Sequence, residues 1–181
     1  MEIKVFSAEH AMVYTTEIDR RESPCTLREA ERHAVAGVVR HVFGRNAEIE
    51  HRADGSPVVG GTEEQCEISV SHGAGLAVVA VGGKERIGVD VECWREQLRR
   101  VSRRFLSIDE ISEWGSKELL LRAWTIKEAV YKAAGIKGLA LMDIHLPESS
   151  SGAVATVFGR RYRLSYFGEF PVAITLAVPE K

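Results

Sequence analysis

Hydrophobic positions along the first third of the chain follow the period of a helix. Between residues 26 and 43 apolar side chains recur three or four positions apart, as they do on one helix face. Thr26 and Glu29 have the spacing of a capping box, and Gly44 follows the last apolar turn. We therefore predict a helix that begins after Thr26 and ends at Gly44. Its expected apolar stripe consists of Leu27, Ala30, Ala34, Val38 and Val42.

The remaining pattern predicts strands in both halves of the chain and a second long helix. Alternating or continuous short apolar runs bounded by turn residues are typical of strands. A DGSPVVGGT segment reads as a loop, and the helix over 116–134 ends at Gly135. Trp94, Leu98, Val101 and Phe105 recur at helical spacing, and a further helix begins near Ser107 or Asp109. The predicted strands cover 2–6, 66–70, 76–82, 86–92 and three more within 142–178, the last separated by SSSG and FGEF turns.

A helix followed by strands thus occurs twice, with a division near Gly82–Lys84. This order predicts an α+β protein with two similar lobes, each a long helix packed on a small antiparallel sheet. The first lobe is expected to span 1–83 and the second 84–181.

Composition narrows the class of protein without naming a function. Hydrophobic residues make up 45% of the chain, charged residues 28%, and the net charge is −2. This balance does not favour nucleic acid as a partner. No run approaches the roughly 20 apolar residues that span a membrane. The three cysteines, Cys25, Cys66 and Cys93, form no metal-binding pair, so we expect reduced thiols in a cytoplasmic protein that binds no membrane.

The strand 86–92 places two carboxylates on one face. Side chains alternate along a strand, so Gly88, Asp90 and Glu92 face one way, with the carboxylates roughly 6–7 Å apart. Both can reach one small cation, and magnesium suits such a pair together with phosphate oxygens. We expect Gly88 to leave space for a ligand. The alternative is an ordinary solvated strand face.

The helix over 116–134 carries a lysine where an apolar residue is expected. Lys127 falls near the middle of the apolar stripe, and burying an ammonium is costly without an anion. Glu128 and Lys132 lie beside it on the helix surface. The pattern predicts a metal–phosphate ligand, whereas the alternative is a snorkelling Lys127 and an ordinary Glu128–Lys132 pair.

A third candidate segment is Ser69-Val70-Ser71-His72-Gly73. Ser69 and Ser71 share one strand face, and His72 follows before a glycine-rich turn. Hydroxyls, imidazole and free backbone amides can bind a diphosphate, although such a histidine often only caps a turn.

Together the segments ISVSHG, IGVDVE and FLSIDE followed by WTIKEAVYKAAGIKG resemble the signatures of the 4'-phosphopantetheinyl transferase superfamily, in the family's order, over roughly residues 54–139. In its length and its additional N-terminal half, the chain resembles the two-lobed, pseudo-dimeric members of the family, which activate synthetases. The resemblance implies transfer of phosphopantetheine from coenzyme A to a serine of an apo acyl or peptidyl carrier protein, with release of 3',5'-adenosine bisphosphate. A monomer would then hold one complete site.

The resemblance also implies roles for individual residues. Magnesium or manganese would be held by Asp90, Glu92 and Glu128. The phosphates of coenzyme A would be bound by His72, Ser71, Lys127, Lys132, Arg28 and Arg32. Catalysis would rest on Lys127 and on Glu128 or Glu110 as the base, a choice the sequence leaves open. At Ser56 the family usually has lysine, so one phosphate contact is expected to pass to the arginines.

Two other functions fit the same residues. A metal-dependent phosphoesterase could use Asp90, Glu92 and Lys127, and a non-catalytic coenzyme A-binding module could keep only the nucleotide contacts. The carrier protein, its fatty acid, polyketide or nonribosomal peptide pathway, and the acceptance of acyl-coenzyme A stay open. A basic surface is expected to dock the acidic carrier, the alternative being a solvated helix face. It comprises Arg95, Arg99, Arg100, Arg103 and Arg104.

Overall fold

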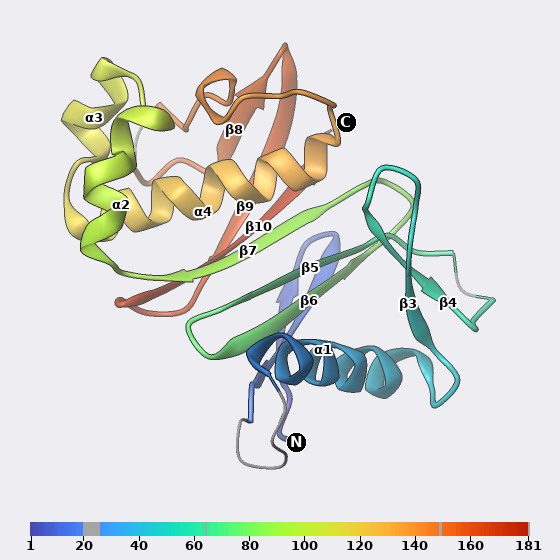
Figure 1. The fold of residues 1–181 in the computed structure, drawn as a ribbon. Coiled ribbons are helices and arrows are strands. Elements are labelled where there is room, and N and C mark those ends of the chain that lie inside the picture. Colours follow the sequence, from blue (N-terminus) through green and yellow to red (C-terminus); the bar gives the residue numbers. More distant parts are fainter. Residues whose placement is uncertain (20–25, 64, 149, 181) are drawn as a thin grey trace.

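Two antiparallel sheets, each covered by one long helix, form the body of the protein (Figure 1). The structure is a computed structural model and describes residues 1–19, 26–63, 65–148 and 150–180. The predicted α+β class is confirmed. None of the described helices is long and apolar enough to cross a membrane.

The first sheet has four strands in the order β1-β2-β6-β5 and is antiparallel throughout. Its strands are β1 (Lys4–Ala8), β2 (Ala11–Glu17), β5 (Ile68–Gly73) and β6 (Leu76–Gly82). The sequence pattern assigned no element to β2. The strand predicted at 66–70 is displaced toward the C-terminus because the ladder with β6 runs through His72 to Gly73.

Helix α1 (Leu27–Phe43) lies against this sheet, and its predicted ends are confirmed. The Thr26 hydroxyl accepts the N–H of Glu29, and the Glu29 carboxylate accepts the N–H of Thr26. Leu27 does not belong to the buried stripe, since it is 46% exposed. The buried side chains of α1 are Ala30, Ala34, Val35, Val38 and Val39.

A short hairpin follows α1 where a loop was expected. Strands β3 (Glu48–His51) and β4 (Pro57–Gly60) pair with each other in a separate two-stranded sheet. Gly55 takes a positive φ of 83° in the intervening turn, a conformation that favours glycine. The DGSPVVGGT segment is therefore partly a strand.

The second sheet has the order β7-β10-β9-β8. Its strands are β7 (Gly88–Cys93), β8 (Val154–Val157), β9 (Arg160–Phe167) and β10 (Val172–Pro179). The helices of this half are α2 (Glu96–Val101), α3 (Ile108–Trp114) and α4 (Lys117–Ala134), with 3-10 turns at Ser102–Arg104 and Leu141–Asp143. The three strands predicted in the tail are present, but the SSSG turn precedes β8. The β8–β9 turn is instead made by Phe158 and Gly159, both with positive φ.

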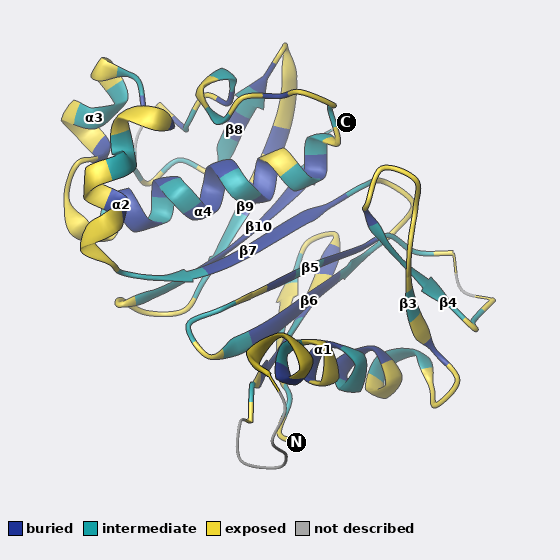
Figure 2. Ribbon diagram, viewed as in Figure 1, coloured by how far each residue is buried: buried dark blue, intermediate teal, exposed yellow. Residues whose placement is uncertain are grey.

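Strand β7 lies between the two halves and is buried from Gly88 to Val91, with its last two residues partly exposed (Figure 2). Ile87, Val89 and Val91 point into a core shared with the first sheet and with β10. On its other face a Cβ at Gly88 would lie 1.9 Å from the Ala129 carbonyl oxygen. The expectation that Gly88 leaves space for a ligand is wrong: the glycine lets the backbone of α4 approach the strand.

Two of the three cysteines lie among the described residues. Cys66 and Cys93 form no disulfide and are partly buried. Cys25 lies outside the described residues.

Candidate functional site

A pocket of about 1430 Å³ opens between α1 and the C-terminal end of α4, and both halves of the chain line it. Its wall is rich in positive side chains, which favour an anionic ligand. The basic and imidazole groups in the wall are Arg28, Arg32, His51, His72, Arg86, Lys132 and Lys137.

Helix α1 supplies one wall of the pocket. Arg28 and Arg32 lie one turn apart and therefore project from the same helix face. Glu31, between them, places its Oε1 atom 3.3 Å from His72 Nδ1 at the end of β5. The structure thus brings together three residues that the sequence analysis assigned to phosphate, Arg28, Arg32 and His72.

Asp90 on β7 lies beside the pocket and is only 7% exposed. Its Oδ1 atom accepts hydrogen bonds from Lys132 Nζ at 2.8 Å and from the Ser71 hydroxyl at 2.9 Å. Burial raises the pKa of Asp90 above its ordinary value, and the Lys132 ammonium opposes that rise. Ser71 and Lys132 therefore lie where they stabilise one carboxylate.

Glu92 follows two residues later on the same strand face. Its carboxylate accepts from the Arg95 guanidinium and from the backbone N–H of Cys93, the latter at 2.9 Å. In this arrangement Glu92 is turned toward a basic side chain at the start of α2.

Glu128 on α4 completes the acidic group. Burial raises the pKa of Glu128, and the negative charges of Asp90 and Glu92 raise it further. Within the described part of the chain, no hydrogen bond or ion pair engages its carboxylate. Three carboxylates therefore repel one another, and none of them lines the pocket. Lys132, which does line it, is the cation that links them to the pocket wall.

The chemistry of these donors fits a divalent metal ion. Three carboxylates with mutual repulsion offer the hard oxygen ligands that magnesium takes, and a cation would relieve the unfavourable charge. Among the described residues, however, no three acidic, histidine or cysteine side chains converge on one point. Asp90 and Glu92 are instead directed at Lys132 and Arg95.

Lys127 and Glu110, which were expected at the phosphate and metal site, lie outside the pocket. Lys127 is fully buried, and its Nζ donates to both Glu110 oxygens, at 3.1 and 2.9 Å, and to the Ile144 carbonyl at 2.7 Å. Glu110 also accepts from the N–H groups of Ser107 and Leu146. Burial lowers the pKa of Lys127, and the Glu110 carboxylate counters this. Neither residue lines the pocket.

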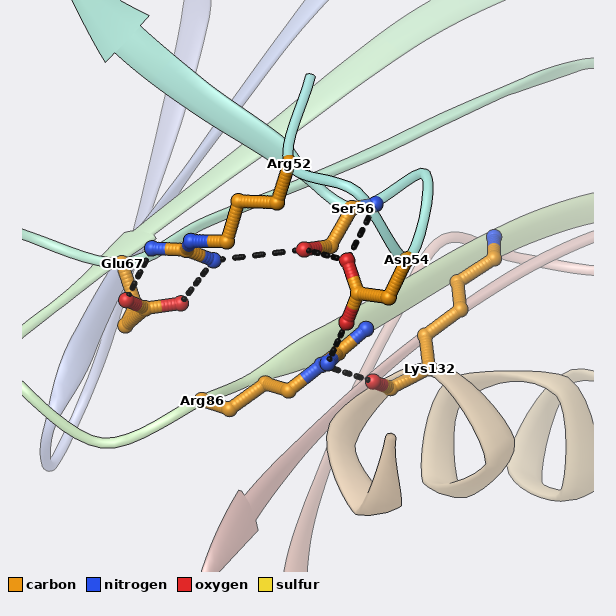
Figure 3. A network of polar contacts seen from close by, with 6 residues as sticks. All are labelled: Arg52, Asp54, Ser56, Glu67, Arg86 and Lys132. Atoms are coloured by element: carbon orange, nitrogen blue, oxygen red, sulfur yellow. Dashed lines mark hydrogen bonds and ion pairs between the residues drawn. The ribbon is translucent and has the colours of Figure 1, made fainter. Parts of the chain in front are cut away.

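The turn of the β3–β4 hairpin forms another part of the pocket wall (Figure 3). Ser56 occupies a buried position and donates its N–H and its hydroxyl to Asp54 Oδ1, at 2.9 and 2.6 Å. The Arg52 guanidinium donates to Ser56 Oγ and forms a bidentate ion pair with the Glu67 carboxylate. Ser56 therefore stabilises the turn.

Arg86 connects that turn to α4 (Figure 3). Its guanidinium donates to Asp54 Oδ2 at 2.7 Å and to the Lys132 carbonyl oxygen at 2.9 Å. Hydrogen bonds from Ser56, followed by the one from Arg86, hold the pKa of Asp54 well below its usual range. Gly135 leaves room for the guanidinium, since a Cβ there would lie 2.4 Å from Arg86 Nη1.

The sequence analysis missed Glu31, Arg86 and Lys137 as pocket residues. Glu31 could have been found from its place between Arg28 and Arg32 on one helix face. Lys137 follows the helix stop at Gly135, where the chain turns toward the pocket. No local signal identifies Arg86, because its partners come from distant segments.

Comparison with known proteins points to one family. The family model described as the 4'-phosphopantetheinyl transferase superfamily matches residues 86–175. The chain is also similar to the 4'-phosphopantetheinyl transferase HetI of Nostoc sp., with 27% identity over 124 residues that cover 59% of this chain. The matched region spans about half (52%) of the length of that relative.

Proposed function

This chain belongs to the 4'-phosphopantetheinyl transferase superfamily, and we propose that it transfers phosphopantetheine from coenzyme A to a serine of an apo carrier protein. The observation that carries the proposal is the pocket itself. Basic side chains line its wall, and two wall residues, Ser71 and Lys132, bind Asp90, which belongs to a group of three neighbouring carboxylates. This arrangement suits a diphosphate with a metal ion. We further propose that residues 1–83 and 84–181 act as two lobes that enclose this pocket.

The proposed division of labour follows the placement of the side chains. Arg28, Arg32 and His72 bind phosphate oxygens from the side of α1, and Lys132 binds them from α4. Asp90, Glu92 and Glu128 would hold a magnesium ion. When bound, this ion would neutralise charge that develops on the diphosphate.

In the reaction the carrier serine oxygen attacks the β-phosphorus of coenzyme A. The bridging P–O bond breaks, and its electron pair leaves with 3',5'-adenosine bisphosphate. We assign the serine proton to Glu128, because within the described part of the chain no hydrogen bond or ion pair occupies its carboxylate. We assign Lys127 and Glu110 to positioning α4, since their groups bind each other rather than facing the pocket.

The test is the intact mass of an apo carrier protein after incubation with the chain, coenzyme A and magnesium. A gain of one phosphopantetheine, abolished by a chelator and by Asp90→Ala, is the expected result. Coenzyme A binding without any gain across several carrier classes would point to a non-catalytic module. Release of phosphate from simple esters in the absence of a carrier would point to a phosphoesterase.

We also propose that the basic surface at Arg95, Arg99, Arg100, Arg103 and Arg104 docks an acidic carrier. Arg99 and Lys117 both lie over the Trp94 ring, at 5.9 and 5.8 Å from its centroid. Arg99→Glu with Arg103→Glu is expected to raise the apparent KM for carrier and to reduce its dependence on salt. An unchanged KM would dismiss this surface.

A further inference from the structure

The two sheets meet at their edge strands, β5 and β7, through serine side chains. The Ser69 hydroxyl accepts the N–H of Val89 at 3.0 Å, and the Ser71 hydroxyl accepts the N–H of Val91 at 3.4 Å. Both serines are buried. From the first hydrogen bond to the second, both strands advance by two residues toward their C-termini, so β5 and β7 are parallel where they meet. A Cβ at Gly73 would lie 2.5 Å from the Val91 carbonyl oxygen, which keeps this contact close.

Ser71 differs from Ser69 because its hydroxyl also donates a hydrogen bond to a carboxylate. A hydroxyl carries a single proton, and that of Ser71 is donated to Asp90 Oδ1 at 2.9 Å. The N–H of Val91 occupies a lone pair of the same oxygen, and this orients the proton toward the carboxylate. No contact between Ser69 and a carboxylate is present among the described residues.

Asp90 is consequently held through one of its two oxygens. Ser71 and Lys132 both donate to Oδ1, and the carboxylate is almost fully buried between β5 and α4. No hydrogen bond within the described ranges engages Oδ2, so that oxygen is available to a ligand. A fixed rotamer with one available oxygen is the arrangement that a preorganised ligand site needs.

We propose that Ser71 is a positioning residue for Asp90 and does not bind the phosphates of coenzyme A. Its proton is already committed to the carboxylate, so it has none to offer a phosphate oxygen. The inference rests on the proposed function, in which Asp90 is a metal ligand. The proposal adds that the contact between β5 and β7 sets the orientation of the Asp90 carboxylate.

The test compares Ser71→Ala with Ser69→Ala in the full chain. Each variant removes one hydroxyl that accepts a β7 N–H, but only Ser71→Ala also removes a hydrogen bond to Asp90. Manganese binding without coenzyme A, followed by electron paramagnetic resonance, is the readout, with Asp90→Asn as the reference variant. Ser71→Cys has nearly the original volume and a weak donor, and it serves if Ser71→Ala does not fold.

We expect Ser71→Ala and Ser71→Cys to weaken manganese binding about 10- to 100-fold, as loss of a contact that supports a ligand does. Ser69→Ala should leave it unchanged. In transfer assays Ser71→Ala should lower kcat while the KM for coenzyme A changes less than about two-fold.

Three other results would overturn the inference in distinguishable ways. Equal manganese affinity in the Ser71 and Ser69 variants, with binding lost in Asp90→Asn, would limit Ser71 to joining the sheets. Unchanged binding in Asp90→Asn would reject Asp90 as a ligand and the proposed metal site with it. A rise in the KM for coenzyme A with unaltered manganese binding would return Ser71 to phosphate binding.

Discussion

Helix α4 carries two lysines that each meet a carboxylate, in different surroundings. Lys127 is fully buried, and its three contacts go to the two oxygens of Glu110 and to a backbone carbonyl. The Lys132 side chain is 30% exposed at the pocket wall and donates to Asp90 and to the Val89 carbonyl. The two residues lie little more than one turn apart.

The difference separates a structural pair from one that can take part in binding. An ammonium has three N–H groups, and those of Lys127 all have protein acceptors in a place that solvent does not reach. Lys132 makes two contacts and faces a pocket, so an incoming phosphate can share its charge. Burial of a lysine is thus a weak indicator of function unless its partners are known.

The largest expected effect comes from breaking the enclosed pair. Lys127→Met should lower the free energy of unfolding by about 3–5 kcal/mol, because the partly buried Glu110 loses its cation. Glu110→Gln should cost a similar amount. The double variant should regain part of the loss, since no unpaired charge is left, but the glutamine amide has one carbonyl oxygen and can accept from only one of the Ser107 and Leu146 N–H groups.

Urea denaturation of the two single variants and the double variant measures this coupling. Lys137→Met, at an exposed position, is the matched control and should change stability by less than about 0.5 kcal/mol. Single variants that lose less than about 1 kcal/mol would mean that the pair is not enclosed in solution.

A second expected effect acts on the contact that holds Lys132 near Asp90. Gly88→Ala places a methyl group against the Ala129 carbonyl, so α4 must move away from β7. We expect a loss of about 1–3 kcal/mol in thermal or urea unfolding. Gly83→Ala is the control, because no atom lies within 4 Å of a Cβ built there. Equal stability of the two variants would show that the helix does not need this close approach.

Much of the fold could be predicted from the sequence because its signals are local. The caps at Thr26 and Gly135 and the alternation around Val89 depend on neighbouring residues, and the structure has these features. The β3–β4 hairpin and the turn before β8 were misassigned. Their strands are only four residues long and carry little pattern.

Partners of the site residues were harder to predict than the residues themselves. The burial of Lys127 follows from its place on the helix, but its carboxylate lies on α3, 17 residues earlier in the chain. The contact of Ser71 with Asp90 joins two sheets and has no local signature either. Helical and strand periodicity show which face a side chain occupies, not what it meets there.

Lys132→Met should affect both stability and binding. It leaves the buried Asp90 carboxylate without its cation, which should lower the free energy of unfolding by about 1–3 kcal/mol. Loss of a charged contact to phosphate should also weaken coenzyme A binding about 10- to 100-fold. Calorimetric titration of coenzyme A measures the affinity, and urea denaturation the stability. Lys117→Met, at the exposed start of the same helix, is the control. Unchanged coenzyme A affinity in Lys132→Met would place the phosphates elsewhere.

The smallest expected effect is a gain in stability when the acidic group loses one charge. The pKa of Glu128 is raised in the folded chain, so the unfolded chain ionises at lower pH. Ionisation of Glu128 therefore lowers the free energy of unfolding as pH rises from the ordinary pKa of 4.5 through the raised pKa of the folded chain. The free energy of unfolding stays lower above that pH. Glutamine does not ionise, so Glu128→Gln should match the parent below pH 4.5 and exceed it near neutral pH. We expect this gain to be on the order of 1 kcal/mol or less because the group is partly screened.

Thermal unfolding across that pH range, with and without magnesium, tests the origin of the gain. If mutual repulsion among Asp90, Glu92 and Glu128 is the cause, magnesium should stabilise the parent more than Glu128→Gln, and the gap between them should narrow. Glu113→Gln, a substitution at an exposed glutamate of α3, is the control and should show neither the pH dependence nor the magnesium effect. If the difference in thermal stability between Glu128→Gln and the parent is constant with pH, the Glu128 carboxylate is no harder to ionise in the folded chain than in water. Mutual repulsion among the three carboxylates would then not destabilise the folded chain, and Lys132 would be left as the residue of α4 that links the acidic group to the pocket.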